Sequence, residues 1–259
     1  MHPSPTLPLS GEGVKFHAEI KWREILAPPP AKGEVGRGGA INNSTKNKST
    51  QKIMIKKPEF DGNDVEVVTR EELYKRFFRV EKITLRHKLF KGGWSKDIGR
   101  EVFIRGDAVA VVVYDPVHDL IGMIEQFRVG ALREAAGPWC YEVVAGMVEK
   151  GESAEEVARR ELFEEASLTP YYMEYICNFL SSPGGSDEKL YLFCCLCDLS
   201  QAGGVHGLAD ENEDIRLHNF AAEDVFAELL NGRFNNAAAL ICLQWLQMNR
   251  ERLRKDHGT

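Results

Sequence analysis

Seven glutamates lie within one short stretch of the chain and raise the question of what so much like charge is for. They are Glu149, Glu152, Glu155, Glu156, Glu161, Glu164 and Glu165. Glu155 precedes Arg159 by four residues, and Glu156 precedes Arg160 by four. At this spacing, Glu–Arg pairs stabilise a helix by roughly 0.2–0.5 kcal/mol each. The last three have no basic residue three or four positions after them. Those three therefore need another explanation.

The spacing of the same stretch predicts a helix over residues 153–167, which begins with the serine and glutamate of a capping box. On a helical wheel, Glu161 and Glu165 fall within the arc of the apolar residues, and Glu164 falls at its edge. The apolar residues of that arc are Ala154, Val157, Ala158 and Leu162. The arginines and the glutamates before them fall on the opposite side.

Carboxylates that point toward apolar residues are costly to bury and raise each other's pKa. A hard divalent cation removes that cost, and Mg²⁺ binds one or two carboxylates together with substrate phosphates. The helix therefore predicts a metal site. The alternative is that these are solvated surface glutamates whose arrangement is a coincidence.

The spacing around this helix resembles the Nudix box, G-x5-E-x7-R-E-U-x-E-E-x-G-U, in which U is a bulky aliphatic residue. Gly146 and Glu152 supply its first two positions, and "RELFEEASL" from Arg160 supplies the rest. Ser167 departs from the pattern, because the family has a glycine there that ends the helix in a left-handed conformation. A serine at that position costs on the order of 1 kcal/mol.

The resemblance implies hydrolysis of a nucleoside diphosphate linked to another group. It assigns metal ligation to Glu161, Glu165 and the backbone carbonyl of Ala145, with Glu164 in support. The arginine and the first glutamate of the box become mainly structural.

Segments outside the box resemble the ADP-ribose pyrophosphatase branch of this family, over about residues 60–255. Pro183 lies 15 residues beyond the end of the box, and "GLADENEDI", residues 207–215, resembles the catalytic loop. The resemblance implies Mg²⁺-dependent hydrolysis of ADP-ribose to AMP and ribose 5-phosphate, with two or more ions per site and Mn²⁺ as a substitute. Glu211 would be the general base and Glu213 a further metal ligand. By itself, this segment could be a solvated acidic turn.

The resemblance also nominates a substrate-binding set. Its members are Phe77, Phe78, Arg100, Glu101, Arg105, Arg128, Met147, Ser182, Pro183, Gly184 and Glu188. The arginines would hold phosphate and ribose oxygens, and the two phenylalanines would stack on adenine. Considered alone, the arginines could be ordinary surface residues. The phenylalanines interrupt the alternation of their predicted strand and could be core or interface aromatics.

The order of elements predicts an α/β (α+β) fold. We expect strands near 64–74, 77–90, 99–106, 107–116, 120–130, 139–146, 172–180 and 188–198, and helices near 153–167, 221–231 and 236–251. The family fold is an α/β/α sandwich with a mixed sheet, here over residues 107–259. A small antiparallel sheet over 54–106 would precede it and serve as the dimerisation region, because the family forms homodimers with shared active sites.

Residues 1–53 are rich in Pro, Gly, Ser and Asn and predict a disordered or non-native extension, with Met54 as a possible true start. They carry a net charge of +4, which leaves −10 on the remainder. An acidic body argues against nucleic acid as a partner, and no apolar run is long enough for a membrane span. Cys194 and Cys197 lie in a predicted strand, where they point to opposite faces and cannot share a metal. We expect six buried, reduced cysteines and a cytoplasmic location.

Two rival functions stay open. One is a Nudix hydrolase of another nucleotide sugar, such as GDP-mannose, which Pro183 and the acidic loop over residues 207–215 disfavour. The other is a non-catalytic nucleotide-binding domain. Such domains usually lose a glutamate of the box, whereas this chain keeps all four.

Overall fold

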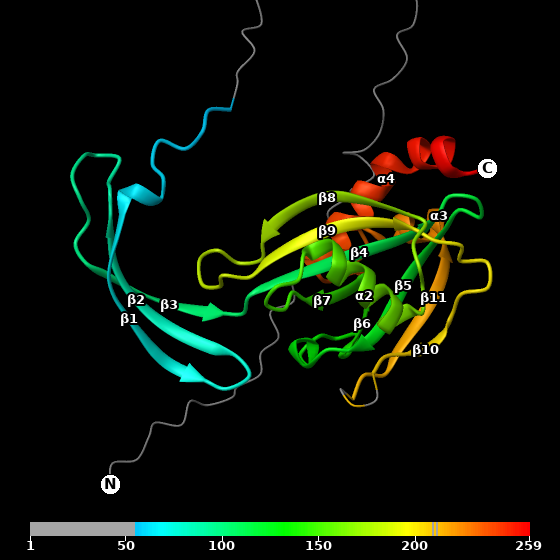
Figure 1. Cartoon of the computed structure of the whole chain (residues 1–259), viewed down its shortest axis with the longest axis horizontal. Helices are drawn as coiled ribbons and strands as arrows, with labels where there is room; N and C mark the ends of the chain where they lie inside the picture. Colours follow the sequence, from blue (N-terminus) through cyan, green and yellow to red (C-terminus); the bar gives the residue numbers. More distant parts are fainter. Residues whose placement is uncertain (1–54, 209, 211) are drawn as a thin grey trace, which may run out of the picture. The chain divides into compact units, whose positions relative to one another are not determined.

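Two β-sheets organise the part of the chain that the computed structural model describes, residues 55–208, 210 and 212–259 (Figure 1). Residues 57–259 form one unit by their internal contacts. The predicted extension over 1–53 and the possible start at Met54 lie outside the described residues.

The first sheet is antiparallel and has three strands in the order β1-β2-β3, as the sequence predicts. The strands are β1 (Val65–Lys75), β2 (Arg79–His87) and β3 (Ile98–Ile104), and a short 3-10 turn (Gly62–Asp64) precedes them. Pairing of Lys75 with Arg79 leaves three residues for the connecting turn. Phe77 and Phe78 therefore lie in this turn, and their predicted place within a strand is wrong.

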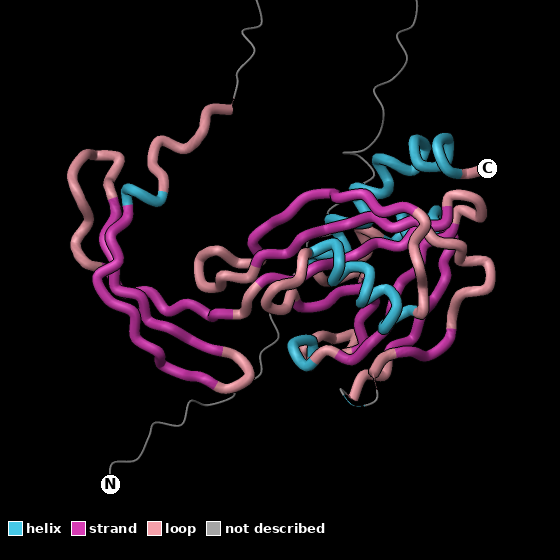
Figure 2. Tube along the Cα trace, in the orientation of Figure 1, coloured by secondary structure: helices cyan, strands magenta, loops and turns pink. Residues whose placement is uncertain are grey.

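The second sheet is mixed and has eight strands. Strands are magenta in Figure 2. They are β4 (Asp107–Asp115), β5 (Leu120–Phe127), β6 (Trp139–Glu142), β7 (Val144–Met147), β8 (Tyr172–Leu180), β9 (Lys189–Leu196), β10 (Gly204–His206) and β11 (Ile215–Ala221). The main order is β10-β11-β5-β4-β9-β8, with β6 on β5 and β7 on β4. Only β4 and β9 pair in parallel among these described strands.

Three details of this sheet differ from the prediction. The strand expected over 139–146 is two strands, β6 and β7, which pair with different neighbours. The strands β10 and β11 were not predicted. The first is only three residues long and begins with a glycine, so it carries little sequence signal, whereas "IRLH" at the start of β11 does alternate between apolar and polar residues.

Helices cover both faces of the mixed sheet, which confirms the α/β/α arrangement. They are α2 (Ala154–Ala166), α3 (Ala222–Glu228) and α4 (Ala237–His257). Strand β4 is buried on both sides: Val109, Val111 and Val113 pack in the core beneath α2, and Ala110, Val112 and Tyr114 pack beneath α3 and α4. The helix α2 is thus fixed on one face by a continuous apolar layer.

The cysteines divide between the same two layers. Cys194 packs in the α4 core, whereas Cys195 and Cys197 pack in the α2 core, so the prediction of opposite faces is confirmed. All six cysteines are free; five are buried and Cys177 is partly buried. Among the described residues, no helix is long and apolar enough to cross a membrane.

Candidate active site

The helix α2 begins and ends as its sequence predicts. Ser153 and Glu156 form the capping box, since the Ser153 hydroxyl accepts from the Glu156 amide and the Glu156 carboxylate accepts from the Ser153 amide. Arg159 pairs with Glu155 at 2.9 Å, as expected. The prediction of an ion pair between Glu156 and Arg160 is wrong. The Glu156 carboxylate bonds to Ser153 at the cap, and the Arg160 guanidinium contacts Glu161 instead.

Two glutamates of α2 point inward, as the helical wheel predicts. The Glu165 side chain is 3% exposed, and its Oε2 accepts a hydrogen bond from the Ala145 amide at 3.0 Å. Burial raises the pKa of Glu165 to about 8, and the charge of Glu161 adds to this effect. Burial likewise raises the pKa of Glu161 to about 7, with a contribution from Glu164. Two neighbouring carboxylates are therefore held where their charged forms are poorly solvated.

A glycine of β7 makes room for one of them. A Cβ atom at Gly146 would lie 1.8 Å from Oε1 of Glu161, a distance that no two such atoms can share. The first glycine of the box therefore lets the Glu161 carboxylate lie directly against the β7 backbone. Ala145, the next residue back, holds Glu165, so β7 and α2 together form the floor of the site.

Arg160 bridges the other acidic residues of the box. Its Nη1 lies 2.8 Å from Oε1 of Glu161 and 3.0 Å from Oε2 of Glu164, and its Nε lies 3.4 Å from Oε1 of Glu152. The prediction that this arginine points away from the glutamates is wrong, because its long side chain folds back along the helix. It offsets part of the negative charge, in agreement with a structural role.

One residue of the acidic loop, Glu213, lies near Glu161 and Glu165. Glu213 accepts from the Leu208 amide at 3.2 Å and donates its own amide to the Leu208 carbonyl at 3.2 Å. Its negative charge raises the pKa of both Glu161 and Glu165, although by less than burial does, so it lies near them. Glu211, the predicted general base, lies outside the described residues.

These residues fit a divalent cation. The predicted ligands offer only oxygen atoms, which hard cations such as Mg²⁺ prefer. Two of the carboxylates are desolvated and repel each other, a cost that a cation between them would remove. The β7 backbone and the Glu161 carboxylate approach more closely than any residue other than glycine at position 146 would allow.

A second cluster gathers part of the nominated substrate set. Arg105 pairs with Glu188 at 2.6 Å and lies over the Phe78 ring, 5.4 Å from its centroid. Phe78 also contacts Phe77, with ring centroids 4.7 Å apart, and Phe77 is 84% exposed. An arginine, a carboxylate and an exposed aromatic ring thus meet at one place.

Hydrogen bonds from two backbone amides hold the two sides of this cluster together. The Phe103 amide donates to the Gly185 carbonyl at 2.8 Å, and the Asp187 carboxylate accepts from the Arg105 amide at 2.8 Å. The turn of Ser182, Pro183 and Gly184 belongs to this loop and is exposed. The end of β3 is thereby joined to the loop that precedes β9.

The remaining nominated residues are more scattered. Arg128 donates to Glu142 at 2.7 Å, and its positive charge lowers the pKa of Glu165, which places it near the buried carboxylates of α2. Met147 ends β7 and is 41% exposed. Arg100 and Glu101 are exposed on β3, and neither forms an ion pair within the described part of the chain. Within the described part of the chain, neither a hydrogen bond nor an ion pair joins the side chains of these last two to either cluster.

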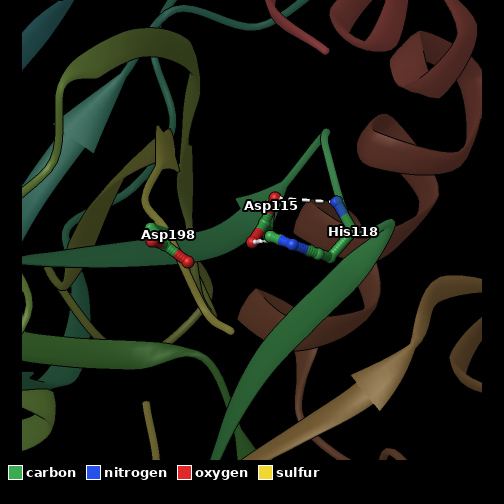
Figure 3. Close-up of side chains that lie close together, drawn as sticks. All are labelled: Asp115, His118 and Asp198. Atoms are coloured by element: carbon green, nitrogen blue, oxygen red, sulfur yellow. Dashed lines mark hydrogen bonds and ion pairs between the residues drawn. The ribbon is translucent and has the colours of Figure 1, made fainter. Parts of the chain in front are cut away.

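A third group, on the far end of β4, is close enough for a metal but has another purpose. Asp115, His118 and Asp198 each place one ligand atom within 4.8 Å of the others (Figure 3). Asp115 already accepts four hydrogen bonds, three from the backbone amides of Val117, His118 and Leu199 and one from Nδ1 of His118. Its buried carboxylate is fully used in fixing the turn after β4, so we interpret this group as structural.

Comparison with known proteins agrees with the fold and the box. Residues 104–240 match the model of the NUDIX domain, and the chain belongs to the Nudix family. It is 44% identical over 197 residues to an ADP-ribose pyrophosphatase of Escherichia coli (strain K12), which covers 76% of this chain and 94% of that one. A GDP-mannose pyrophosphatase of Pectobacterium atrosepticum is 27% identical over 185 residues, covering 70% and 92%.

A solved structure also shares the fold. It is the crystal structure of an ADP compounds hydrolase, with a TM-score of 0.56 and 21% identity, and the match covers 76% of this chain and 97% of that one. The family, together with the 44% identical ADP-ribose pyrophosphatase, makes the chain a hydrolase that acts on pyrophosphate bonds.

Proposed function

We propose that this chain hydrolyses the pyrophosphate of ADP-ribose to AMP and ribose 5-phosphate. The observation that carries the proposal is the convergence of the box carboxylates Glu161 and Glu165 on the β7 backbone at Ala145 and Gly146. Similarity to an ADP-ribose pyrophosphatase over most of the chain supports the choice of substrate. The lower identity to a GDP-mannose pyrophosphatase makes that sugar nucleotide the second candidate.

Glu161, Glu165, Glu213 and the Ala145 carbonyl would hold the divalent cations, with Mg²⁺ as the expected ion at two or more positions and Mn²⁺ as a substitute. When bound, such ions would neutralise charge on the pyrophosphate and lower the pKa of a coordinated water. The side chains themselves supply fixed oxygen atoms, and Arg160 holds Glu161 and Glu164 in place.

Glu211 is our candidate for the general base, on the strength of its place in the acidic loop. Glu164 is the alternative, because its side chain is 25% exposed beside the buried pair and contacts Arg160 at 3.0 Å. Substituting each with glutamine separates them, since the base is the residue whose loss removes the acidic limb of the pH–rate profile.

Arg105, Glu188 and Phe78 would form part of the ADP-ribose site. A guanidinium offers a fork of donors that suits phosphate and ribose oxygens, and the exposed Phe77 ring beside it suits stacking on adenine. Arg128 and Met147 lie nearer the carboxylates, where the phosphates would be. The roles of Arg100, Glu101 and the 182–184 turn rest on the family resemblance.

The N-terminal sheet supports a homodimer in which each subunit completes the other's site. A sheet of three antiparallel strands needs a hydrophobic face or a packed helix for its stability, and β1 is exposed along its whole length. Its exposed residues include Val65, Val67, Val68, Leu73 and Tyr74. An open edge with apolar side chains is a surface that proteins normally cover. Light scattering should therefore give a dimer at micromolar concentration, and a stable, active monomer would contradict this.

The free cysteines are consistent with a reducing compartment, and we propose that the protein acts in the cytoplasm on a small-molecule substrate, with neither nucleic acid nor membrane as a partner. A panel of ADP-ribose, GDP-mannose and related nucleotide sugars, each with Mg²⁺, tests the substrate. The largest kcat/KM should belong to ADP-ribose. A larger value for GDP-mannose would transfer the proposal to that substrate.

A further inference from the structure

The last turn of α2 makes two contacts with the segment that leads into the acidic loop. The Ser167 hydroxyl lies 3.0 Å from Nδ1 of His206, at the end of β10. The next amide, that of Gly207, donates to the Glu164 carbonyl at 3.3 Å. The final carbonyls of a helix have no partner inside it, so this one is available to another segment.

Ser167 is the position at which this chain departs from the box. It has a left-handed conformation, with φ 53° and ψ 35°, which glycine adopts without strain. Its backbone amide already caps the helix by donating to the Phe163 carbonyl at 2.9 Å. The hydroxyl takes no part in that cap, and its partner is the histidine.

His206 is held at both ring nitrogens. Nε2 lies 3.0 Å from the Gly203 carbonyl, which only accepts, so Nε2 carries a proton. In the neutral ring, Nδ1 then accepts from the Ser167 hydroxyl. The two contacts fix the orientation of the ring relative to the end of α2.

Gly207, the residue after His206, packs directly against Glu213. It has a φ of +102°, and a Cβ atom there would lie 2.8 Å from the Cβ atom of Glu213. Leu208 forms two hydrogen bonds with Glu213, one through the backbone and one through the carboxylate. Contacts of described residues thus run without a break from the Ser167 hydroxyl to the Glu213 side chain.

We infer that Ser167 and His206 are positioning residues, which hold the Glu213 end of the acidic loop against α2. They act through Gly207 and Leu208 rather than on substrate. The inference rests on the proposed function in one respect, since the use of Glu213 as a metal ligand belongs to that proposal.

The substitution Ser167→Gly separates this role from simple helix capping. Glycine relieves the left-handed strain, so the thermal midpoint should rise or stay unchanged. The hydroxyl contact is lost, so the Gly207 and Glu213 amides should exchange about fivefold faster with solvent, the factor that corresponds to one hydrogen bond of typical strength. The Mg²⁺ concentration for half-maximal activity should rise about threefold to fivefold, while the KM for ADP-ribose stays within twofold.

Three further variants complete the test. His206→Ala should reproduce the faster exchange, and the double variant should be no worse than either single one, because both remove the same contact. Ser167→Asn should restore slow exchange, since asparagine tolerates the left-handed conformation and its amide can donate to Nδ1. His118→Ala is the matched control, because this half-exposed histidine also fixes a turn but one at the far end of β4.

Hydrogen exchange, read by mass spectrometry to single residues, is the first measurement because it does not depend on activity. If Ser167→Gly and His206→Ala leave the two amides unchanged, or if their effects simply add, the inference is overturned. A wild-type protein that fails to hydrolyse ADP-ribose would remove the proposed function, yet the exchange data would still decide whether these residues position the loop.

Discussion

Glu165→Gln should make the metal-free protein more stable at alkaline pH. The carboxyl of Glu165 has a pKa of about 8 in the folded protein, against an ordinary value of 4.5. A carboxyl whose pKa is higher in the folded than in the unfolded state destabilises the fold as the pH rises between the two values. The cost is absent below the lower value and complete above the higher one. Glutamine carries no charge and avoids this cost.

The size of the effect follows from the two pKa values. One pKa unit corresponds to about 1.4 kcal/mol, so the charged carboxylate costs about 4 kcal/mol at pH 8 and less than about 1 kcal/mol at pH 5. Glutamine keeps an acceptor for the Ala145 amide, but a buried amide group without a partner costs about 1–3 kcal/mol at either pH. The effect of Glu165→Gln on the unfolding free energy should therefore be about 3 kcal/mol more favourable at pH 8 than at pH 5.

Urea denaturation in EDTA, at one protein concentration and at both pH values, measures this difference. Glu155→Gln is the matched control, because this carboxylate lies on the exposed side of the same helix and pairs with Arg159. It should change the unfolding free energy by less than about 0.5 kcal/mol at either pH. Equal effects of Glu165→Gln at pH 5 and pH 8 would contradict this prediction, since they would show that the folded protein does not perturb this carboxyl.

Three other substitutions probe different parts of the molecule. Gly146→Ala should displace the Glu161 carboxylate while the chain still folds. Half-maximal activity should therefore need about tenfold more Mg²⁺, while the urea midpoint changes little. An unchanged Mg²⁺ requirement would contradict the close contact between Gly146 and Glu161. Asp119→Asn should cost about 2–3 kcal/mol at pH 7, because Asp119 accepts from Tyr114 and Arg250, whose contact holds the pKa of Asp119 below its usual value. That stability is present above the ordinary pKa of 3.8 and fades as the pH falls through the lower folded value, so the two proteins should converge in acid when followed by circular dichroism. Arg105→Ala should raise the KM for ADP-ribose about tenfold and leave kcat within threefold, whereas a change in kcat alone would place Arg105 at the reacting atoms.

The box helix could be predicted because its information is local. Capping and helical periodicity depend on residues within a few positions of each other, and they placed Glu161 and Glu165 on the buried side. Arg160 could not be placed in this way, because a wheel gives the direction of the Cβ atom and not the path of a long side chain. Its contacts with three glutamates depend on which carboxylates the fold leaves within reach.

Contacts between segments that are far apart in the chain could not be predicted from the sequence. Arg105 pairs with Glu188 because β3 is hydrogen-bonded to the loop before β9, and no local sequence pattern predicts that pairing. The contact of Ser167 with His206 depends in the same way on β10, which is too short to predict. The family resemblance supplied the nominated residues, and the structure shows that Arg105, Glu188 and Phe78 are in contact.

Product analysis of ADP-ribose incubated with the purified protein and Mg²⁺ tests the proposed activity and its site together. We expect equal amounts of AMP and ribose 5-phosphate from the wild type, no products in EDTA, and a rate at least about a hundredfold lower for Glu165→Gln. Full activity of Glu165→Gln, or no turnover of ADP-ribose with either Mg²⁺ or Mn²⁺, would contradict the assignment of this site.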